Sequence, residues 1–391
     1  MAGGNPGLAT TEALLAELIA FDTTSRLSNL ALIEHVRAYL QGHGIASELV
    51  FDETGAKANL FATIGPDTHG GIVLSGHTDV VPVDGQDWSS DPFTLVERDG
   101  LLYGRGTCDM KGFIACVLSK VPEWTSRPLK EPVHLAFSYD EEVGCLGVHG
   151  LLEHVVRNHP RPRLAIVGEP TSMQVVDSHK GIQSFFTEVT GLEAHSSATH
   201  VGVSAILAAA DLIHFLGQLA EELRAEGDPS GRFTPGYTTI SVGTIEGGTA
   251  INIIPRTCRF GWEFRPLPGA DPARILARFE AFANDVVLPA MQARFPGASI
   301  VTRPRSHCPP LDAEPGSAAE TLALALAESN ETHAVSYTTE ASLFQKSAAI
   351  PTVVCGPGDI LQAHRPDEFV ARSQLSLCLD FLDRLTARII A

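Results

Sequence analysis

The stretch that decides the fold is Ile72-Val73-Leu74-Ser75-Gly76-His77-Thr78-Asp79. Its apolar residues are followed at once by a small polar residue, a glycine, a histidine and an aspartate. A short apolar run with such a boundary is typical of a buried strand in a parallel sheet. In an open α/β sheet, functional side chains gather at the carboxyl ends of the strands. We therefore expect His77 and Asp79 to stand at a strand end, inside a functional site.

The same arrangement recurs further along the chain, after the apolar runs 133–137 and 164–167. Several loops together offer side chains that could bind a divalent metal, and none requires a thiolate. These side chains are His77, Asp109, Glu141, Glu142, Glu169 and His364. Imidazoles and carboxylates suit a catalytic zinc or another first-row ion better than a structural zinc site. Any one of them alone would be an ordinary residue, but their conjunction at strand ends indicates a metal centre.

Two positions in this set suggest specific roles. A metal-bound imidazole normally donates its second N–H to a carboxylate, which fixes the tautomer of the ring. For His77 the natural carboxylate partner is Asp79, ahead of Asp84. Asp109 follows a turn that contains glycine, and a carboxylate there can bridge two ions held about 3.5–4 Å apart. The pattern thus indicates a centre for two ions.

The adjacent Glu141 and Glu142 favour a carboxylate base as the catalyst. Neighbouring side chains diverge, so one glutamate can bind metal while the other faces the activated water as general base. The chain contains no Gly-x-Ser-x-Gly motif, which disfavours a serine hydrolase. It also lacks a Walker motif and a dinucleotide-binding fingerprint. Metal-assisted hydrolysis is therefore the favoured chemistry.

Composition excludes several other classes of protein. The formal net charge of -18 argues against nucleic acid or an anionic membrane as a partner. The seven cysteines are dispersed and form no Cys-x-x-Cys pair, which is typical of a reduced compartment. No start typical of a signal peptide and no apolar run of about 18 residues is visible. We expect a soluble cytoplasmic protein.

The 391 residues exceed the usual size of a single core, so two domains are expected. Residues 1–178 and 308–391 show strands alternating with helices, which predicts an α/β domain with a mostly parallel mixed sheet. Residues 179–307 show the order β-α-β-β-α-β instead, which is the ferredoxin-like signature. The strands expected in this inserted α+β domain are 182–189, 237–245, 253–264 and 298–303, and the helices are 205–219 and 273–293.

The motifs resemble a known family of co-catalytic zinc hydrolases, the aminoacylase, carboxypeptidase and acetylornithine deacetylase group. The resemblance covers almost the whole chain. It rests on residues 76–82 (GHTDVVP), 104–112 (GRGTCDMKG), 140–144 (DEEVG) and 168–171 (GEPT). Residues 339–341 (TEA) and 356–368 (GPGDILQAHRPDE) are most similar to the acetylornithine deacetylase branch.

This resemblance implies a zinc-exopeptidase-like catalytic domain and a reaction that removes the acetyl group from N2-acetyl-L-ornithine. The alternatives within the family are another N-acyl amino acid amidohydrolase, a succinyl-diaminopimelate desuccinylase-like enzyme and a di- or tripeptidase. A non-catalytic relative is disfavoured because the whole set of candidate ligands is intact. Two divalent ions are implied, zinc first and cobalt as a second possibility.

The resemblance also assigns roles in the metal centre. One ion would be bound by His77, Asp109 and Glu169, and the other by Asp109, Glu142 and His364. Glu141 would be the general base, and Asp79 would orient His77.

For the inserted domain, the resemblance implies a lid that also forms a homodimer through residues 179–307. His195, in Gly-Leu-Glu-Ala-His-Ser, would reach the site of a neighbouring subunit and stabilise the oxyanion. Asn252 and Arg265 would contact the substrate carboxylate, and Lys180 is a further candidate for that contact. On its sequence context alone, His195 would be an ordinary surface residue.

Overall fold

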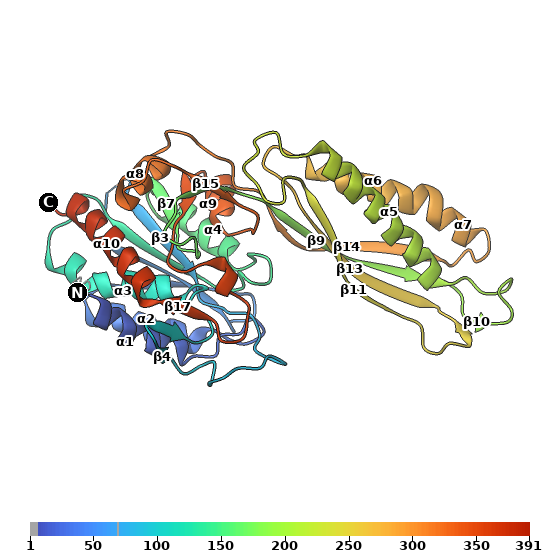
Figure 1. Ribbon diagram of the computed structural model, residues 1–391, viewed down its shortest axis with the longest axis horizontal. Coiled ribbons are helices and arrows are strands. Elements are labelled where there is room, and N and C mark those ends of the chain that lie inside the picture. Colours follow the sequence, from blue (N-terminus) through green and yellow to red (C-terminus); the bar gives the residue numbers. More distant parts are fainter. Residues whose placement is uncertain (1–6, 69) are drawn as a thin grey trace. The chain divides into compact units, whose positions relative to one another are not determined.

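Figure 1 shows a computed structural model of the chain, which describes residues 7–68 and 70–391. The chain divides into two compact units. Unit 1 comprises Met1–Ser178, Leu311–Ala334 and Thr339–Ala391, and unit 2 comprises His179–Pro310 and Val335–Thr338. Residues 308–310 and 335–338, which the sequence placed in the first domain, thus belong to unit 2.

Unit 1 is built on a sheet with the strand order β1-β2-β6-β3-β7-β16-β8-β15. These strands are β1 (Ser47–Phe51), β2 (Ala58–Ile64), β3 (Ile72–His77), β6 (Val133–Ser138), β7 (Leu164–Val167), β8 (Val176–His179), β15 (His333–Val335) and β16 (Thr352–Val354). The central strands β6, β3, β7 and β16 run parallel, whereas β2 and β8 run antiparallel to their neighbours. The predicted α/β class with a mixed, mostly parallel sheet is confirmed.

Helices cover both faces of this sheet because its central strands are apolar on both sides. Ile72 and Leu74 join one core with helices α1, α2, α3, α8 and α10, while Val73 is buried on the opposite side. On that opposite side α4 and α9 pack against each other and against the strands. The helices are α1 (Leu8–Ile19), α2 (Leu30–Gly42), α3 (Lys111–Ser126), α4 (Val148–Asn158), α8 (Ala318–Ala327), α9 (Ala341–Ala348) and α10 (Arg372–Ile389). A small antiparallel sheet of β4 (Val96–Arg98), β5 (Leu101–Tyr103) and β17 (Phe369–Ala371) completes unit 1.

Unit 2 has the β-α-β-β-α-β order that the sequence predicts. Its antiparallel sheet has the strand order β11-β13-β9-β14, and an apolar core joins it to the helices. Its elements are β9 (Ile182–Thr190), β10 (Ala194–His195), α5 (Ala205–Glu226), β11 (Thr239–Gly247), β12 (Ile253–Ile254), β13 (Thr257–Arg265), α6 (Pro272–Phe282), a π-helical turn (Ala283–Val287), α7 (Leu288–Gln292) and β14 (Ser299–Cys308). No helix among the described residues is both long and apolar enough to cross a membrane.

Candidate metal centre

His77 is the last residue of β3, and its buried ring faces two carboxylates. Its Nε2 lies 2.9 Å from Oδ1 of Asp109 and 3.6 Å from Oε1 of Glu169. Its Nδ1 lies 2.9 Å from the backbone carbonyl oxygen of Asp79. A carbonyl oxygen can only accept, so Nδ1 carries a hydrogen and Nε2 is the atom available to a metal.

The partner of His77 is therefore the backbone of Asp79 rather than its side chain, which corrects the expectation from the sequence. The carboxylate of Asp79 lies 3.6 Å from Nδ1, beyond hydrogen-bonding distance. It accepts instead from the backbone N–H groups of Glu141 and Glu142, at 3.1 and 3.3 Å, and from the hydroxyl of Ser25 at 2.7 Å. Asp79 thus holds the loop that carries both glutamates.

His364 completes the other side of the centre. Its Nε2 lies 3.0 Å from Oε2 of Glu142 and 3.4 Å from Oδ2 of Asp109. The two oxygens of Asp109 therefore face one histidine each, as a carboxylate that bridges two ions would. His364 has φ 63, a left-handed conformation that is uncommon outside glycine and often marks functional sites.

The remaining glutamates close the cluster. Potential ligand atoms of His77, Glu141 and Glu169 lie within 4.8 Å of one another, and so do those of His77, Asp109 and Glu142. The structure thus brings together all six side chains in which the sequence predicted a ligand or a base. All six come from strand ends or loops of unit 1.

The electrostatics of the cluster favour bound cations. Burial raises the pKa of Glu141, Glu142 and Glu169, and repulsion from neighbouring carboxylates adds to the effect. Burial alone would lower the pKa of His77, but the acidic charges of Glu169 and Asp109 raise it well above its usual value. Buried charges in proteins are paired or coordinate metals. Buried carboxylates with one buried imidazole (His77) and one half-exposed imidazole (His364) at these distances fit a divalent first-row ion.

Glu368 anchors the loop that carries Asp109. Its Oε1 accepts from the backbone N–H groups of Gly106, Cys108 and Asp109, at 3.0, 2.9 and 3.1 Å. Its Oε2 accepts from the guanidinium of Arg105 at 2.6 Å, and both side chains are buried. The sequence did not single out this role. Its position could have indicated the role, because Glu368 lies four residues after the candidate ligand His364 and within the motif 356–368.

Glu340 connects the ends of β3 and β6. It is fully buried, and its two oxygens accept from the hydroxyls of Ser75 and Ser138 at 2.6 and 2.7 Å. Ser75 lies in β3 and Ser138 in β6, just ahead of the residues that form the centre. Glu340 therefore ties together the ends of the two strands. Sequence analysis assigned no role to Glu340 beyond its place in the segment 339–341 that carries the family resemblance.

Comparison with known proteins places this arrangement in a family. Residues 73–388 match Peptidase family M20/M25/M40. The chain belongs to this family.

Two acetylornithine deacetylases resemble the chain over nearly all of its length. It is 38% identical over 387 residues to the acetylornithine deacetylase of Myxococcus xanthus, with 97% of each chain covered. It is 34% identical over 387 residues to the acetylornithine deacetylase of Pasteurella multocida (strain Pm70), with 95% of this chain and 96% of that protein covered. The M20 family metallo-carboxypeptidase Sso-CP2 from Sulfolobus solfataricus shares the fold, with a TM-score of 0.76, 18% identity and 98% of each chain covered.

In this M20 family protein the other predicted site residues belong to unit 2. His195 and Asn252 are exposed neighbours, because β10 pairs with β12 and the carbonyl oxygen of Asn252 accepts from the N–H of Ser196. The backbone N–H of Ser197 points at Nδ1 of His195 at 3.2 Å. A backbone N–H only donates, so in the neutral ring Nε2 carries the hydrogen and is free to donate.

The two basic candidates in unit 2 differ from each other. Arg265 is partly exposed and forms an ion pair with Glu263 at 2.9 Å. Lys180 is buried, and its Nζ donates to the carbonyl oxygens of Pro235 and Tyr237, both at 2.7 Å. These contacts use two of the three N–H donors of the ammonium group. Lys180 thus has a structural role within unit 2, and its contact with a substrate carboxylate stays a prediction.

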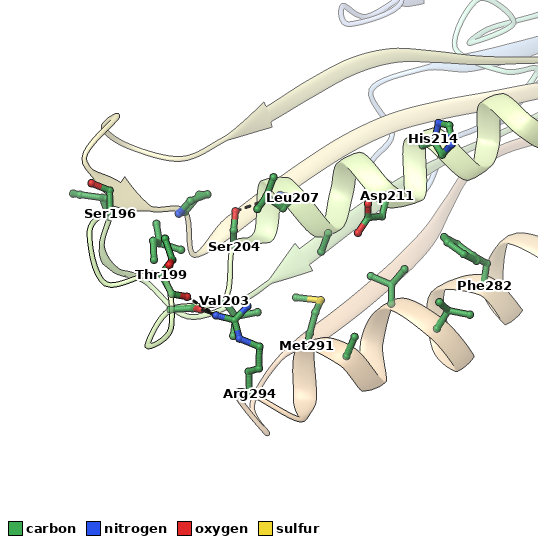
Figure 2. Close-up of a pocket in the computed structure, with 18 residues that line it drawn as sticks. Ser196, Thr199, Val203, Ser204, Leu207, Asp211, His214, Phe282, Met291 and Arg294 are labelled. Atoms are coloured by element: carbon green, nitrogen blue, oxygen red, sulfur yellow. Dashed lines mark hydrogen bonds between the residues drawn. The ribbon is translucent and has the colours of Figure 1, made fainter.

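Unit 2 also contains an apolar groove of about 640 Å³ (Figure 2). Its walls are residues of α5 and of the segments 196–204, 253–255 and 282–294. Leu207 and Val286, which line it, expose 68% and 54% of their surfaces. Large apolar side chains gathered at such a surface are typical of a protein interface.

Proposed function

We propose that the chain is a metal-dependent amidohydrolase that converts N2-acetyl-L-ornithine into L-ornithine and acetate. The observation that carries the proposal is the buried carboxylate of Asp109 with a histidine at each of its oxygens and Glu141 nearby. The full-length similarity to proteins named acetylornithine deacetylase supports the choice of substrate. An enzyme of this kind would serve arginine synthesis in the cytoplasm.

The cofactor would be a pair of divalent ions, zinc or cobalt. The first would be held by His77, Asp109 and Glu169. The second would be held by Asp109, Glu142 and His364. When bound, the ions would polarise the amide carbonyl and acidify a water molecule.

Glu141 would move the proton. It accepts a proton from the attacking water, whose oxygen bonds to the acetyl carbon. When the C–N bond breaks, Glu141 passes that proton to the departing amine. Burial raises the pKa of Glu141, which suits a group that must hold a proton between the two steps.

Unit 2 would complete the site. The Nε2 hydrogen of His195 would stabilise the developing oxyanion, and Asn252 and Arg265 would bind the substrate carboxylate.

We further propose that two copies associate through unit 2, because Leu207 and the groove around it leave apolar surface uncovered. Leu207→Asp should lower the molecular mass measured by sedimentation from dimer to monomer. A wild-type chain that sediments as a monomer at micromolar concentration would rule out the dimer.

A panel of substrates tests the function. The purified protein is supplied with Zn²⁺ or Co²⁺ and assayed with N2-acetyl-L-ornithine, N-succinyl-diaminopimelate and a dipeptide. We expect kcat/KM for acetylornithine to exceed the others at least ~10-fold, because a change of one substrate group usually alters kcat/KM by this much or more. A preference for the succinyl group or the dipeptide would move the protein to another branch of the family. Absence of metal-dependent hydrolysis on all three would contradict the proposal.

A further inference from the structure

A second cluster of potential metal ligands lies in unit 1, on side chains that the catalytic centre does not use. His154 Nε2 lies 2.7 Å from Oε2 of Glu48, and His159 Nε2 lies 3.0 Å from Oε1 of the same carboxylate. The ligand atoms of all three residues lie within 4.8 Å of one another. One carboxylate therefore offers a separate oxygen to each of two imidazoles.

Three different parts of the fold place these side chains. Glu48 lies in β1, the edge strand of the central sheet, opposite Phe61 of β2. His154 lies in α4, which packs against both of these strands. The chain leaves α4 at His159 in an extended conformation, and the ring of His159 packs 4.7 Å from the ring of Phe61. The packing thus holds both imidazoles towards the same carboxylate.

One nitrogen of this cluster makes no hydrogen bond within the part of the chain that the structure describes. Nε2 of His159 is buried, yet it forms no hydrogen bond with any described residue, despite its closeness to Glu48. Buried polar atoms without a partner are rare in folded proteins and cost stability. An ion placed between the imidazoles and the carboxylate would satisfy this nitrogen.

The distances fit a small transition metal. Bonds of about 2.0–2.1 Å in a tetrahedral site place the ligand atoms ~3.3 Å apart. The observed 2.7 and 3.0 Å require the side chains to separate by only a few tenths of an ångström. The ring of His154 can be oriented for binding, because the amide of Asn158 lies 3.0 Å from its Nδ1. If the side-chain amide of Asn158 rotates by about 180°, its oxygen accepts the Nδ1 hydrogen of His154.

We propose that Glu48, His154 and His159 form a divalent-cation site separate from the catalytic centre. Two imidazoles and a carboxylate select Zn²⁺, Ni²⁺ or Cu²⁺ over Mg²⁺ and Ca²⁺. The partial exposure of the side chains leaves room for water as a further ligand. Because the ion joins β1 to the end of α4, it stabilises the folded chain without taking part in hydrolysis.

The test compares Zn²⁺ binding by the full-length wild-type protein, His154→Gln and His35→Gln. His35 is the matched control, because it also lies near a phenylalanine ring and pairs with a single glutamate, Glu17. Within residues 7–68 and 70–391, no second imidazole pairs with Glu17. The Zn²⁺ content at saturation and the thermal midpoint with and without added Zn²⁺ are measured, with activity as a check on the catalytic centre.

We expect His154→Gln to bind one equivalent of Zn²⁺ fewer than the wild type and to lose part of the thermal stabilisation by Zn²⁺. His35→Gln should match the wild type, and the activity of both variants should be unchanged. Glu48→Gln, a change at a half-exposed side chain, should give the same loss and covers the case in which His154→Gln folds poorly. Equal Zn²⁺ stoichiometry in wild type, His154→Gln and Glu48→Gln would overturn the proposal.

Discussion

The candidate residues in the two units are held in opposite ways. In unit 1 most of the candidate ligands are buried, although His364 is half-exposed. Asp79 accepts from the backbone of both glutamates, and Glu368 accepts from the backbone of Asp109. In unit 2 His195 and Asn252 are exposed. The pairing of β10 with β12 brings their backbones together, and Ser197 contacts the ring of His195. Groups that bind metal and move protons need fixed geometry, whereas groups that meet a substrate must first be reachable. Under the proposed function, unit 1 would bind the metal ions and move the proton, and the exposed residues of unit 2 would contact the substrate and its oxyanion.

The largest effect is expected from Glu141→Gln, which removes the proposed base of unit 1 and leaves unit 2 unchanged. An amide of the same shape cannot accept the proton of the attacking water, so kcat should fall at least ~1,000-fold. Metal content should stay at the wild-type level, because the ligands assigned to the two ions are untouched. Steady-state kinetics and metal analysis on the same sample check both points. If the variant keeps more than a tenth of the activity, another group is the base.

His195→Ala should have the next largest effect. Removal of one oxyanion donor typically lowers kcat ~100- to 1,000-fold, while the metal content is unaffected. His200→Ala is the control, since His200 is an exposed histidine in the same loop. Similar losses in the two variants would indicate a damaged loop instead of a missing donor. Full activity of His195→Ala would show that unit 2 contributes no oxyanion donor through this residue.

Glu368→Gln tests the support within unit 1. An amide cannot match the charge of Arg105, and its nitrogen cannot accept the backbone N–H groups of the Asp109 loop. We expect metal affinity to fall ~10- to 100-fold, as for other residues that support metal ligands. Glu97→Gln is the control, because Glu97 also accepts a backbone N–H, from Gly100, but on the exposed surface. Metal titration that gives equal affinities for both variants would remove Glu368 from the support of the centre.

Removal of the metal should make the stability of unit 1 depend on pH. Hydrogen bonds to Asp109 and Glu142 raise the pKa of His364 to about 10, from 6.5 in the unfolded chain. The folded metal-free protein therefore binds more protons than the unfolded chain, and its stability falls as the pH rises from about 6.5 to about 10.

The raised pKa values of the three buried glutamates act in the same direction, so their contribution does not cancel that of His364. Bound cations replace these protons, so thermal midpoints of the metal-loaded protein should vary less over this range. Parallel pH profiles with and without metal would contradict this account.

The positions of the candidate metal ligands could be predicted because they depend on local sequence. His77 and Glu169 each follow a short apolar run, and such runs end where the sheet ends. The supporting contacts could not be predicted in this way. Arg105 and Glu368 are 263 residues apart, and Ser75 and Glu340 are 265 apart, so only the folded chain pairs them.

Two errors inside unit 2 have local causes. The expected strand 253–264 is divided into β12 and β13 around Pro255, which has no N–H to give to a ladder. The expected helix 273–293 is interrupted by a π-helical turn just before Pro289. A proline inside a helix cannot pair with the carbonyl four residues earlier, and the wider turn accommodates this. Both prolines were visible in the sequence.

The smallest effect is expected from Ser197→Ala, and it tests how unit 2 orients its histidine. The Oγ of Ser197 lies 2.7 Å from Nδ1 of His195, but the backbone N–H of the same residue also points at Nδ1 and survives the substitution. Loss of one exposed hydrogen bond of two should lower kcat only ~2- to 10-fold. When Ser197→Ala is introduced into His195→Ala, kcat should fall no further, because no ring remains to be oriented. If the serine substitution lowers kcat equally in both backgrounds, it acts on the loop and not through the histidine.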